Sequence, residues 1–374
     1  MPRLSQVEVY DLSVQTLTPI HIGSGESLNR FDYIHVDDWL YVVDHDKLFQ
    51  ELERIRFVEK YLRELETGRT SLNTFLRNNR VDLRQFAENV VRYRMRLGGQ
   101  LNAGDFSYQL KTFIRTVDGQ IYLPGSGLKG SLRTSLIYGI LKNDQKIRGE
   151  LLTEIGRAKK VSGVLVEKVL RLGSGSFESD LLRLLRPSDL FPLTSVETRA
   201  ARLLSMSFRN GRERDLGYVE VVPAGVVFRG RLHVFMSQKV VNSVARKDMV
   251  GRLVGDLVGM MNERSQAVLQ RDVERLRGLS NADGVVQRLN SVLEEALRAG
   301  EMEAVTSLGF GQGYWKTTVT MAFEGQEKMV FGSLRDKRLK HANPKSFPSS
   351  MRLVREDAGG EPRPPGWVKL SFRG

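Results

Sequence analysis

The sequence predicts an α+β protein made of two units of similar size. Its 374 residues allow two or three domains at roughly 100–200 residues each. Hydrophobic residues make up 41% and charged residues 27% of the chain, which is the balance of a globular protein. Each half runs from strand to helix to strand and contains a glycine-rich turn. This order is compatible with two α+β sandwiches of ferredoxin-like type, one over residues 1–180 and one over 181–374.

The N-terminal unit begins with strand patterns and then changes to helical spacing. Residues 7–17 are rich in β-branched side chains and predict a strand, and residues 33–43 predict a hairpin. Apolar residues at helical spacing predict a helical insertion at about 46–100, with helices over 44–66, 71–78 and 82–96. The expected elements after it are strands at 106–115 and 120–123, a helix at 128–142, and a charged helical stretch at 145–180.

The C-terminal unit is expected to follow a similar order. Residues 187–193 are expected to be extended, and residues 217–236 are expected to form a strand pair around Pro223. A helical region is expected at 239–299. The remaining expected elements are a glycine-rich turn at 309–313, a strand at 316–323, and a basic tail from 333 that ends in a strand at 367–372.

The charge balance favours a polyanionic partner. Lys and Arg total 57 and Asp and Glu total 44, which gives a formal net charge of +13, and such a surplus is typical of proteins that bind nucleic acid or an anionic membrane. The absence of cysteine excludes disulfides, Cys-ligated metals and a thiol nucleophile. The N-terminus lacks a secretory pattern, and no apolar stretch is long enough to span a membrane. We therefore expect a cytoplasmic protein, with no metal and no cofactor.

The strongest local motif is PGSGLKGSLR at 124–133. Two of its glycines would let the backbone approach a ligand, and Ser126 is placed to cap the helix that follows. Lys129 and Arg133 lie four residues apart and share one helix face. Free N–H groups at a helix start, together with two cations, predict an anion site. Its candidate residues are Gly125, Ser126, Gly127, Lys129, Gly130 and Arg133.

The same motif leaves two alternatives open. Gly125, Gly127 and Gly130 formally match G-x-G-x-x-G, which in a βαβ unit would indicate a nucleotide-cofactor enzyme. The preceding strand pattern is short, and no parallel βαβ pattern follows. The loop is also compatible with a tight strand-to-helix turn that binds nothing.

Two further glycine loops are candidates for RNA contact. GFGQGYWK at 309–316 places alternate glycines beside aromatic residues and a cation; its backbone could hold phosphate, and Tyr314 or Trp315 could stack on a base. The aromatic residues could equally enter the core at a β-bulge. HIGSG at 21–25 contains a histidine that would contact phosphate, act as a general base or serve a structural role. The candidates in these two loops are Gly309, Gly311, Gly313, Lys316, His21, Gly23 and Gly25.

Arginine and lysine also cluster outside the loops. Any one cluster is explained by a solvated surface, but several together favour contact with a phosphate backbone. The five histidines show no metal-binding or hydrolase spacing, so no catalytic residue is predicted. The residues of the basic clusters are Arg92, Arg94, Arg96, Arg212, Arg214, Lys337, Arg338 and Lys340.

Three segments in this order, LTPIHIGSG, YLPGSGLKGSLRTSL and LGFGQGYWKT, resemble the RAMP superfamily of CRISPR-associated proteins. The resemblance implies ferredoxin-like, RNA-recognition-type domains. It also implies a non-enzymatic subunit of a type III-A effector complex, placed at the 3′ end of the guide RNA (crRNA). The implied partners are the crRNA, the repeating backbone subunit, the small helical subunit and target RNA. Some relatives process precursor guide RNA with a histidine, so an endoribonuclease acting through His21 is the alternative.

Overall fold

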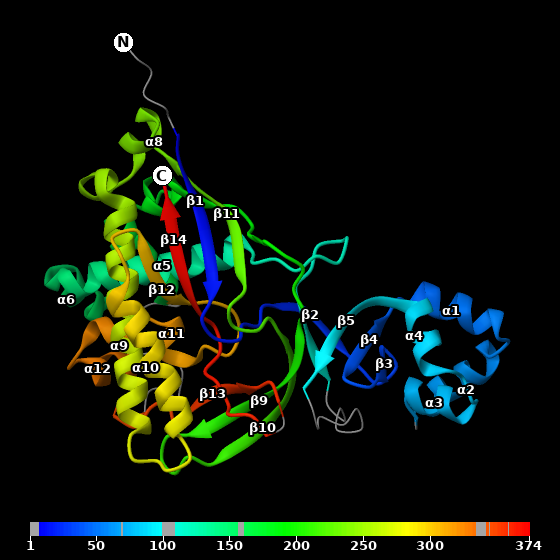
Figure 1. The fold of residues 1–374 in the computed structure, drawn as a ribbon. Coiled ribbons are helices and arrows are strands. Elements are labelled where there is room, and N and C mark those ends of the chain that lie inside the picture. Colours follow the sequence, from blue (N-terminus) through cyan, green and yellow to red (C-terminus); the bar gives the residue numbers. More distant parts are fainter. Residues whose placement is uncertain are drawn as a thin grey trace.

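The computed structural model describes residues 7–68, 70–98, 109–155, 161–333, 342–343, 345–357 and 359–374. Two β-sheets and their covering helices form the molecule, which confirms the predicted α+β class (Figure 1). Across this described part of the chain, no helix is both long enough and apolar enough to span a membrane.

Sheet 1 is antiparallel and has six described strands. Helices α5 (Gly125–Asn143) and α9 (Leu253–Leu276) share one hydrophobic core with it. The strands, in spatial order, are β12 (Glu303–Ser307), β14 (Trp367–Arg373), β1 (Val7–Thr16), β11 (Val227–Phe235) and β7 (Leu185–Pro187), with β8 (Phe191–Pro192) also on β11.

This sheet contains a ferredoxin-like unit. Along the chain its main elements follow the order β1, α5, β7, β11, α9, β14, and in space β1 and β11 lie at the centre. β1 suits a central position with one face buried, because Leu12 and Val14 point into the core while Asp11 and Gln15 are exposed. The unit is complete only with strands from both ends of the chain.

Sheet 2 is mixed and has eight described strands. Its parallel pairs are β6 with β10 and β5 with β9, and its other pairs are antiparallel. The strands, in spatial order, are β2 (Gly23–Leu28), β6 (Leu110–Phe113), β10 (Glu213–Val221), β9 (Arg199–Ser207), β5 (Val91–Leu97), β4 (Trp39–Val43) and β3 (Tyr33–Val36), with β13 (Ser350–Arg355) also on β9.

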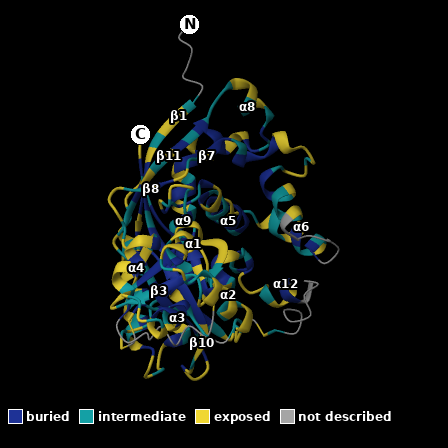
Figure 2. Ribbon diagram, turned by 90° about the vertical axis from the view of Figure 1, so that its right-hand side faces the viewer, coloured by how far each residue is buried: buried dark blue, intermediate teal, exposed yellow. Residues whose placement is uncertain are grey.

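The helical insertion lies between β4 and β5 and projects from the end of sheet 2 (Figure 1). It has its own core, which includes Leu48, Leu52, Tyr61 and Phe75, and this core continues onto β3 and β4. Figure 2 shows buried residues along the strands and the inner helix faces, with exposed residues on the outer faces. The helices of the insertion are α1 (His45–Arg54), α2 (Val58–Thr67), α3 (Leu72–Asn78) and α4 (Leu83–Val90).

The other helices surround sheet 1 and the junction of the two sheets. α10 and the C-terminal half of α9 form a second core with β9 and β13. The α-helices of this group are α6 (Gln145–Ile155), α7 (Val161–Leu165), α8 (Gln238–Ser243), α10 (Asp283–Arg298), α11 (Gly313–Thr317) and α12 (Glu327–Ser333). A π-helix spans Val166–Leu170, and 3₁₀ helices span Phe177–Ser179, Leu181–Arg183, Lys247–Arg252 and Thr320–Phe323.

Several predicted elements differ in the structure. The helix expected at 44–66 is two helices, because Arg56 takes a left-handed backbone conformation (φ 59°) between them. The helix expected at 82–96 ends at Val90; exposed arginines then alternate with more buried residues in β5, which is a period-two strand pattern. The strand expected at 316–323 is instead α11 and a 3₁₀ helix.

The strands expected to pair around Pro223 belong to different sheets. β10 lies in sheet 2 and β11 in sheet 1, and the chain crosses between the sheets at the Pro223 turn. Each sheet also takes strands from both sides of residue 180. The sequence boundary at 180 therefore does not separate the two sheets.

A buried carboxylate joins the centre of sheet 2 to the first glycine loop. Glu220 on β10 is fully buried, and its carboxylate accepts hydrogen bonds from the Phe113 amide at 2.8 Å and the Thr198 hydroxyl at 2.6 Å. The Arg115 guanidinium pairs with the same carboxylate. The Glu220 carbonyl oxygen accepts a bond from His21 Nδ1 at 2.6 Å. One residue thus links two strands, a loop and a cation.

We expect Glu220→Ala to lower the free energy of unfolding by about 3–5 kcal/mol, because it leaves Arg115 poorly solvated and without its carboxylate. Urea unfolding of the full chain measures the change. Glu197→Ala is the matched control: its ion pair with Arg96 is half-exposed on both sides, so its loss should cost less than about 1 kcal/mol. Equal losses in the two variants would contradict the role of Glu220.

Candidate nucleic-acid interface

Two of the three glycine loops lie against each other. The first loop (18–25) and the C-terminal loop (309–313) are joined where the Phe310 amide donates to the His21 carbonyl at 2.7 Å. Gly366, which precedes β14, bonds to both segments: its amide donates to Pro19 at 2.8 Å, and its carbonyl accepts from Leu308 at 2.7 Å. We call the surface formed by 18–25, 309–313 and Lys111 the joined-loop surface.

Glycine is required at 309 by contact within the chain. Gly309 has φ 84°, and a Cβ at this position would lie 2.3 Å from the His21 carbonyl oxygen. The sequence predicts that the backbone of this loop could hold phosphate. In the structure, the group that approaches Gly309 is the first loop itself.

The joined-loop surface exposes an aromatic ring beside a cation. Phe310 is 43% exposed, and the Lys111 Nζ lies 4.6 Å from its ring centroid. The His21 ring packs against Phe310 at nearly a right angle, with centroids 5.8 Å apart. Beneath the exposed strand β2, the hydroxyls of Ser24 and Thr112 are 2.6 Å apart. An exposed aromatic ring beside a cation is suited to contact with a single-stranded nucleic acid.

The backbone of the C-terminal loop adds a hydrogen-bond donor. The N–H group of Gly311 donates to no group within the described ranges, while Gln312 closes the turn at 310–311. A Cβ at Gly311 would lie 3.7 Å from the Arg352 Cβ, which places a second cationic residue beside the loop. A free N–H group near cations favours an anion. Phosphate contact at Gly309, Gly311 and Gly313 stays a prediction.

His21 is a structural residue in this arrangement. Its side chain is 2% exposed, and its Nδ1 donates to the Glu220 carbonyl. Burial lowers the pKa of His21 below 6.5, so the ring is neutral at pH 7 and its Nε2 carries no proton. That nitrogen faces Gly23, at 3.3 Å from where a Cβ would lie. Gly25 is exposed, with φ 92°. A general base acting on RNA is not favoured by this burial.

The aromatic residues expected to stack on a base belong to the core. Tyr314 and Trp315 are 5.0 Å apart between ring centroids and pack with Phe331. Lys316 is also buried; its Nζ lies 4.7 Å from the Trp367 ring centroid, and burial lowers its pKa to about 8. The expectation that Lys316 faces phosphate is therefore corrected, and the core alternative holds for the two aromatic residues. Phe310 takes the exposed aromatic position.

The second glycine loop forms the first turn of α5. Its N-cap is Pro124, so Ser126 does not cap the helix. The Gly125 amide donates to the Asp189 carboxylate at 2.8 Å, and a Cβ at Gly125 would lie 2.4 Å from the Pro187 carbonyl oxygen. The first free N–H group of this helix is thus satisfied by an acidic side chain.

This geometry disfavours a dinucleotide. A pyrophosphate at the start of α5 would meet the Asp189 carboxylate. Just before the loop, the described residues form isolated antiparallel bridges, Ile121 with Arg115 and Leu123 with Leu190, in place of a parallel strand. Ser126, Gly127 and Arg133 are exposed, while Lys129 and Gly130 are partly buried. Burial, followed by repulsion from Arg133, lowers the pKa of Lys129. The two cations remain available to an anion on the side of the helix.

The predicted basic clusters lie on separate parts of the molecule. Arg92, Arg94 and Arg96 are exposed on one face of β5, where two of them lie over the Trp39 ring at 4.5 and 5.8 Å. Arg212 and Arg214 are exposed near the β9–β10 turn, at the far end of sheet 2 (Figure 1). The remaining predicted residues, Lys337, Arg338 and Lys340, lie outside the described residues.

Sequence reasoning missed Phe310 and Lys111. The alternation Gly309-Phe310-Gly311 was the available signal for Phe310, because an aromatic side chain between two left-handed glycines sits at the tip of a turn. Lys111 had no local signal, since it approaches Phe310 only through the pairing of β6 with β2 and β10. In the part of the chain that the structure covers, no group of three or more His, Asp or Glu side chains forms a possible metal site.

Comparison with known proteins identifies relatives of the whole chain. A sequence model of the RAMP superfamily matches residues 13–314. A Streptococcus thermophilus protein named CRISPR system Cms protein Csm5 is 23% identical over 357 residues, covering 94% of this chain and 91% of that protein. A protein of the same name from Enterococcus italicus is 30% identical over 150 residues, covering 34% of this chain and 43% of the relative.

Solved structures show the same fold. A chain in the cryo-EM structure of a Csm–crRNA–target RNA ternary complex of a type III-A CRISPR-Cas system matches with a TM-score of 0.71 at 19% identity, covering 97% of this chain and 100% of that chain. The crystal structure of T. onnurineus Csm5 matches with a TM-score of 0.66 at 17% identity, covering 95% and 99%. These likenesses extend over both sheets and the helical insertion.

We expect Gly309→Ala to separate the joined loops. Gly313→Ala is the matched control, because both glycines have a positive φ (84° and 76°) but a Cβ at Gly313 meets nothing within 4 Å. The free energy of unfolding of the Gly309 variant should be about 1–3 kcal/mol lower than that of the control, because only its methyl group collides with the His21 carbonyl. Denaturant unfolding of both variants provides the measurement. Equal stability would show that this contact is unimportant.

The buried His21 predicts a pH dependence of stability. Its pKa is lowered in the folded state, so the unfolded chain takes up the proton first as the pH falls. The free energy of unfolding should therefore be level above about pH 6.5 and decrease below it, by up to about 1.4 kcal/mol per pH unit, until the folded-state pKa is passed. His21→Asn, which keeps a donor for Glu220, should flatten this slope, whereas His45→Asn at an exposed site should not.

Proposed function

The chain belongs to the RAMP superfamily, and on this premise we propose that it is an RNA-binding structural subunit of a type III-A (Csm) CRISPR effector complex. In this role it caps the 3′ end of the crRNA and contributes to crRNA maturation and complex assembly in antiviral defence. Its partners are the crRNA, target RNA and other Csm subunits, in particular the repeating RAMP backbone subunit and the small helical subunit. It acts in the cytoplasm.

The observation that carries the proposal is the joined-loop surface. Two loops from opposite ends of the chain meet there and present Phe310, Lys111 and the free Gly311 N–H group on one face. Such a surface can stack on a base and contact a phosphate, and neither contact depends on the sequence of the RNA. A subunit that holds guides of many sequences requires this kind of contact.

The comparisons support the same assignment. The S. thermophilus relative and the T. onnurineus structure, which match almost the whole chain, carry the name Csm5. The ternary complex that contains a similar chain also contains crRNA and target RNA. The net charge of +13 provides the long-range attraction that association with RNA needs.

The proposed role is non-enzymatic. His21, the residue on which the endoribonuclease alternative rests, is buried and bonded to Glu220. The nucleotide-cofactor alternative rests on Gly125, whose amide is bonded to Asp189. Incubation of the purified chain with precursor crRNA, with and without divalent metal, tests for cleavage directly, and cleavage that is lost in His21→Ala would overturn the non-enzymatic assignment.

We expect Phe310→Ala to weaken RNA binding by about 5- to 100-fold, which corresponds to the loss of one stacked base. Binding of single-stranded crRNA to the full chain, followed by fluorescence anisotropy, measures the effect. Lys111→Gln should reduce the slope of log affinity against log salt by about 0.7, the value for one phosphate contact on a single strand.

The matched control for Phe310 is Phe49→Ala in the helical insertion, since Phe49 is 40% exposed and lies outside the joined-loop surface. Phe310→Tyr should restore binding, which separates stacking from loss of fold. Purification of the tagged protein from its source cell should also recover crRNA and Csm subunits. Recovery of the protein without RNA, together with unchanged affinity in Phe310→Ala, would rule out the proposed function.

A further inference from the structure

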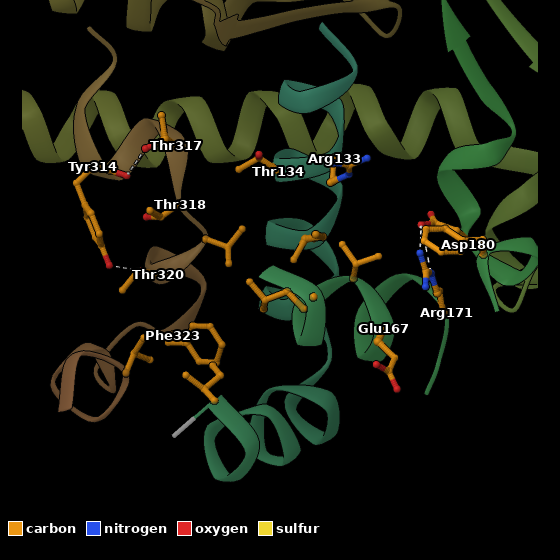
Figure 3. Close-up of a pocket in the computed structure, with 18 residues that line it drawn as sticks. Arg133, Thr134, Glu167, Arg171, Asp180, Tyr314, Thr317, Thr318, Thr320 and Phe323 are labelled. Atoms are coloured by element: carbon orange, nitrogen blue, oxygen red, sulfur yellow. Dashed lines mark hydrogen bonds and ion pairs between the residues drawn. The ribbon is translucent and has the colours of Figure 1, made fainter. Parts of the chain in front are cut away.

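A cavity of about 860 Å³ lies beside α5 and contains none of the joined-loop residues. Its main walls are α5, the segment from α7 through the π-helix, and the segment from α11 through the following 3₁₀ helix (Figure 3). Ile155 of α6, Val330 of α12 and the segment that carries Phe177 and Asp180 complete the lining. Its volume falls within the range of small-molecule sites, about 300–1,000 Å³. Nothing derived so far gives this cavity a role.

The walls combine apolar and hydroxyl-bearing side chains. Ile137 from α5, Val166 from the π-helix and Phe323 are among the apolar residues. The wall formed by α11 and the following 3₁₀ helix, which also carries Phe323, bears the hydroxyls, and Figure 3 shows Tyr314, Thr317, Thr318 and Thr320 together on that side. The Tyr314 and Thr320 hydroxyls are bonded to each other at 2.8 Å. A largely apolar cavity with a few polar groups on one wall is suited to a flat ring with polar edges.

A second observation comes from the backbone of one wall. Residues Val166–Leu170 form a π-helix. Its first two residues, Val166 and Glu167, line the cavity together with the preceding Leu165. π-helical turns are rare and occur mainly at functional sites, because they are less stable than the α-helix they interrupt. The wall is therefore built from a conformation that packing alone does not favour.

Cations lie at one side of the cavity. Arg133 lines it, is exposed, and forms no ion pair with any described residue. Lys129 lies one turn earlier on α5, where Arg133 and Arg186 repel its positive charge and Asp180 attracts it. Arg171 is bonded to Asp180 at 3.4 Å and lies 4.3 Å from the ring centroid of the exposed Phe177. Because Asp180 neutralises Arg171, the two cations that would gain from an anion at this position are Arg133 and Lys129.

We propose that this cavity binds one nucleotide, with the base between the apolar and hydroxyl walls and the phosphate at Arg133 and Lys129. The inference rests on the proposed function in identifying the ligand as the 3′-terminal nucleotide of the crRNA. A free nucleoside monophosphate has the same chemistry, and the experiment distinguishes the two sources. The cations favour a phosphate-bearing ligand over an apolar side chain of a partner protein, which is the competing occupant.

Gly163→Phe blocks the cavity without changing its charge. Gly163 lies on α7 and lines the cavity, and a Cβ at this position meets nothing within 4 Å. Gly149→Phe is the matched control: it is also an exposed helical glycine with free space around a Cβ, but it is on α6 and does not line the cavity. Neither replacement should destabilise its helix, because glycine is the weaker helix former.

The test uses two RNAs that differ only in whether the 3′-terminal nucleotide carries a base. The wild-type chain and Gly149→Phe should bind the RNA without the terminal base about 5- to 100-fold more weakly than the intact RNA. Gly163→Phe should bind both RNAs alike, at the weaker affinity. Removal of the base from the 5′-terminal nucleotide should have no effect on any of the three proteins.

Adenosine monophosphate at millimolar concentration distinguishes the ligand sources. A rise in the melting temperature of the wild type and Gly149→Phe, but not of Gly163→Phe, indicates that free nucleotide also binds. If the wild type binds RNA well but shows neither the 3′-base effect nor the nucleotide shift, the cavity inference fails while the proposed function stands. Loss of partner subunits in Gly163→Phe, with the 3′-base effect retained, would overturn the inference in favour of a protein occupant.

Discussion

The buried carboxylate of Glu220 is the interaction on which the arrangement of the joined loops depends. Its side chain neutralises Arg115 and fixes the amide of Phe113, while its carbonyl holds the His21 ring. Because the first loop is fixed by His21, the His21 carbonyl is placed to accept the Phe310 amide. A buried charge must have hydrogen-bond and ion-pair partners. Here the residue that carries the charge also sets the position of the exposed Phe310 ring.

The same chain of contacts explains how the two ends of the sequence build one surface. β1 and β14 are neighbours in sheet 1. The first loop, which follows β1, is hydrogen-bonded to Gly366, which precedes β14. β6 then brings Lys111 from sheet 2 to the same place. The joined-loop surface therefore lies where the two sheets meet. Its geometry is maintained by strand register.

Much of this fold could be predicted from local patterns, while the pairing of distant segments could not. β1, the β3–β4 hairpin and α5 follow from alternation, turn residues and helical spacing. Separation of β10 and β11 into two sheets depends on partners far away in sequence. At the site, local sequence patterns indicate the glycine loops but not the contacts between them. The capping of Gly125 by Asp189, the burial of Lys316 and the contact of Lys111 with Phe310 are tertiary and left no local signal.

The glycines of these loops have two different roles. At Gly125, Gly309 and Gly366, an added Cβ would lie 2.4, 2.3 and 2.4 Å from a carbonyl oxygen of the chain itself. These glycines permit close backbone contact inside the protein. Around Gly25 and Gly313 a Cβ meets nothing, so those positions leave space for a ligand. Since glycine contributes no side chain, affinity for RNA then depends on the neighbouring residues that the glycines expose, and Phe310 is the clearest case.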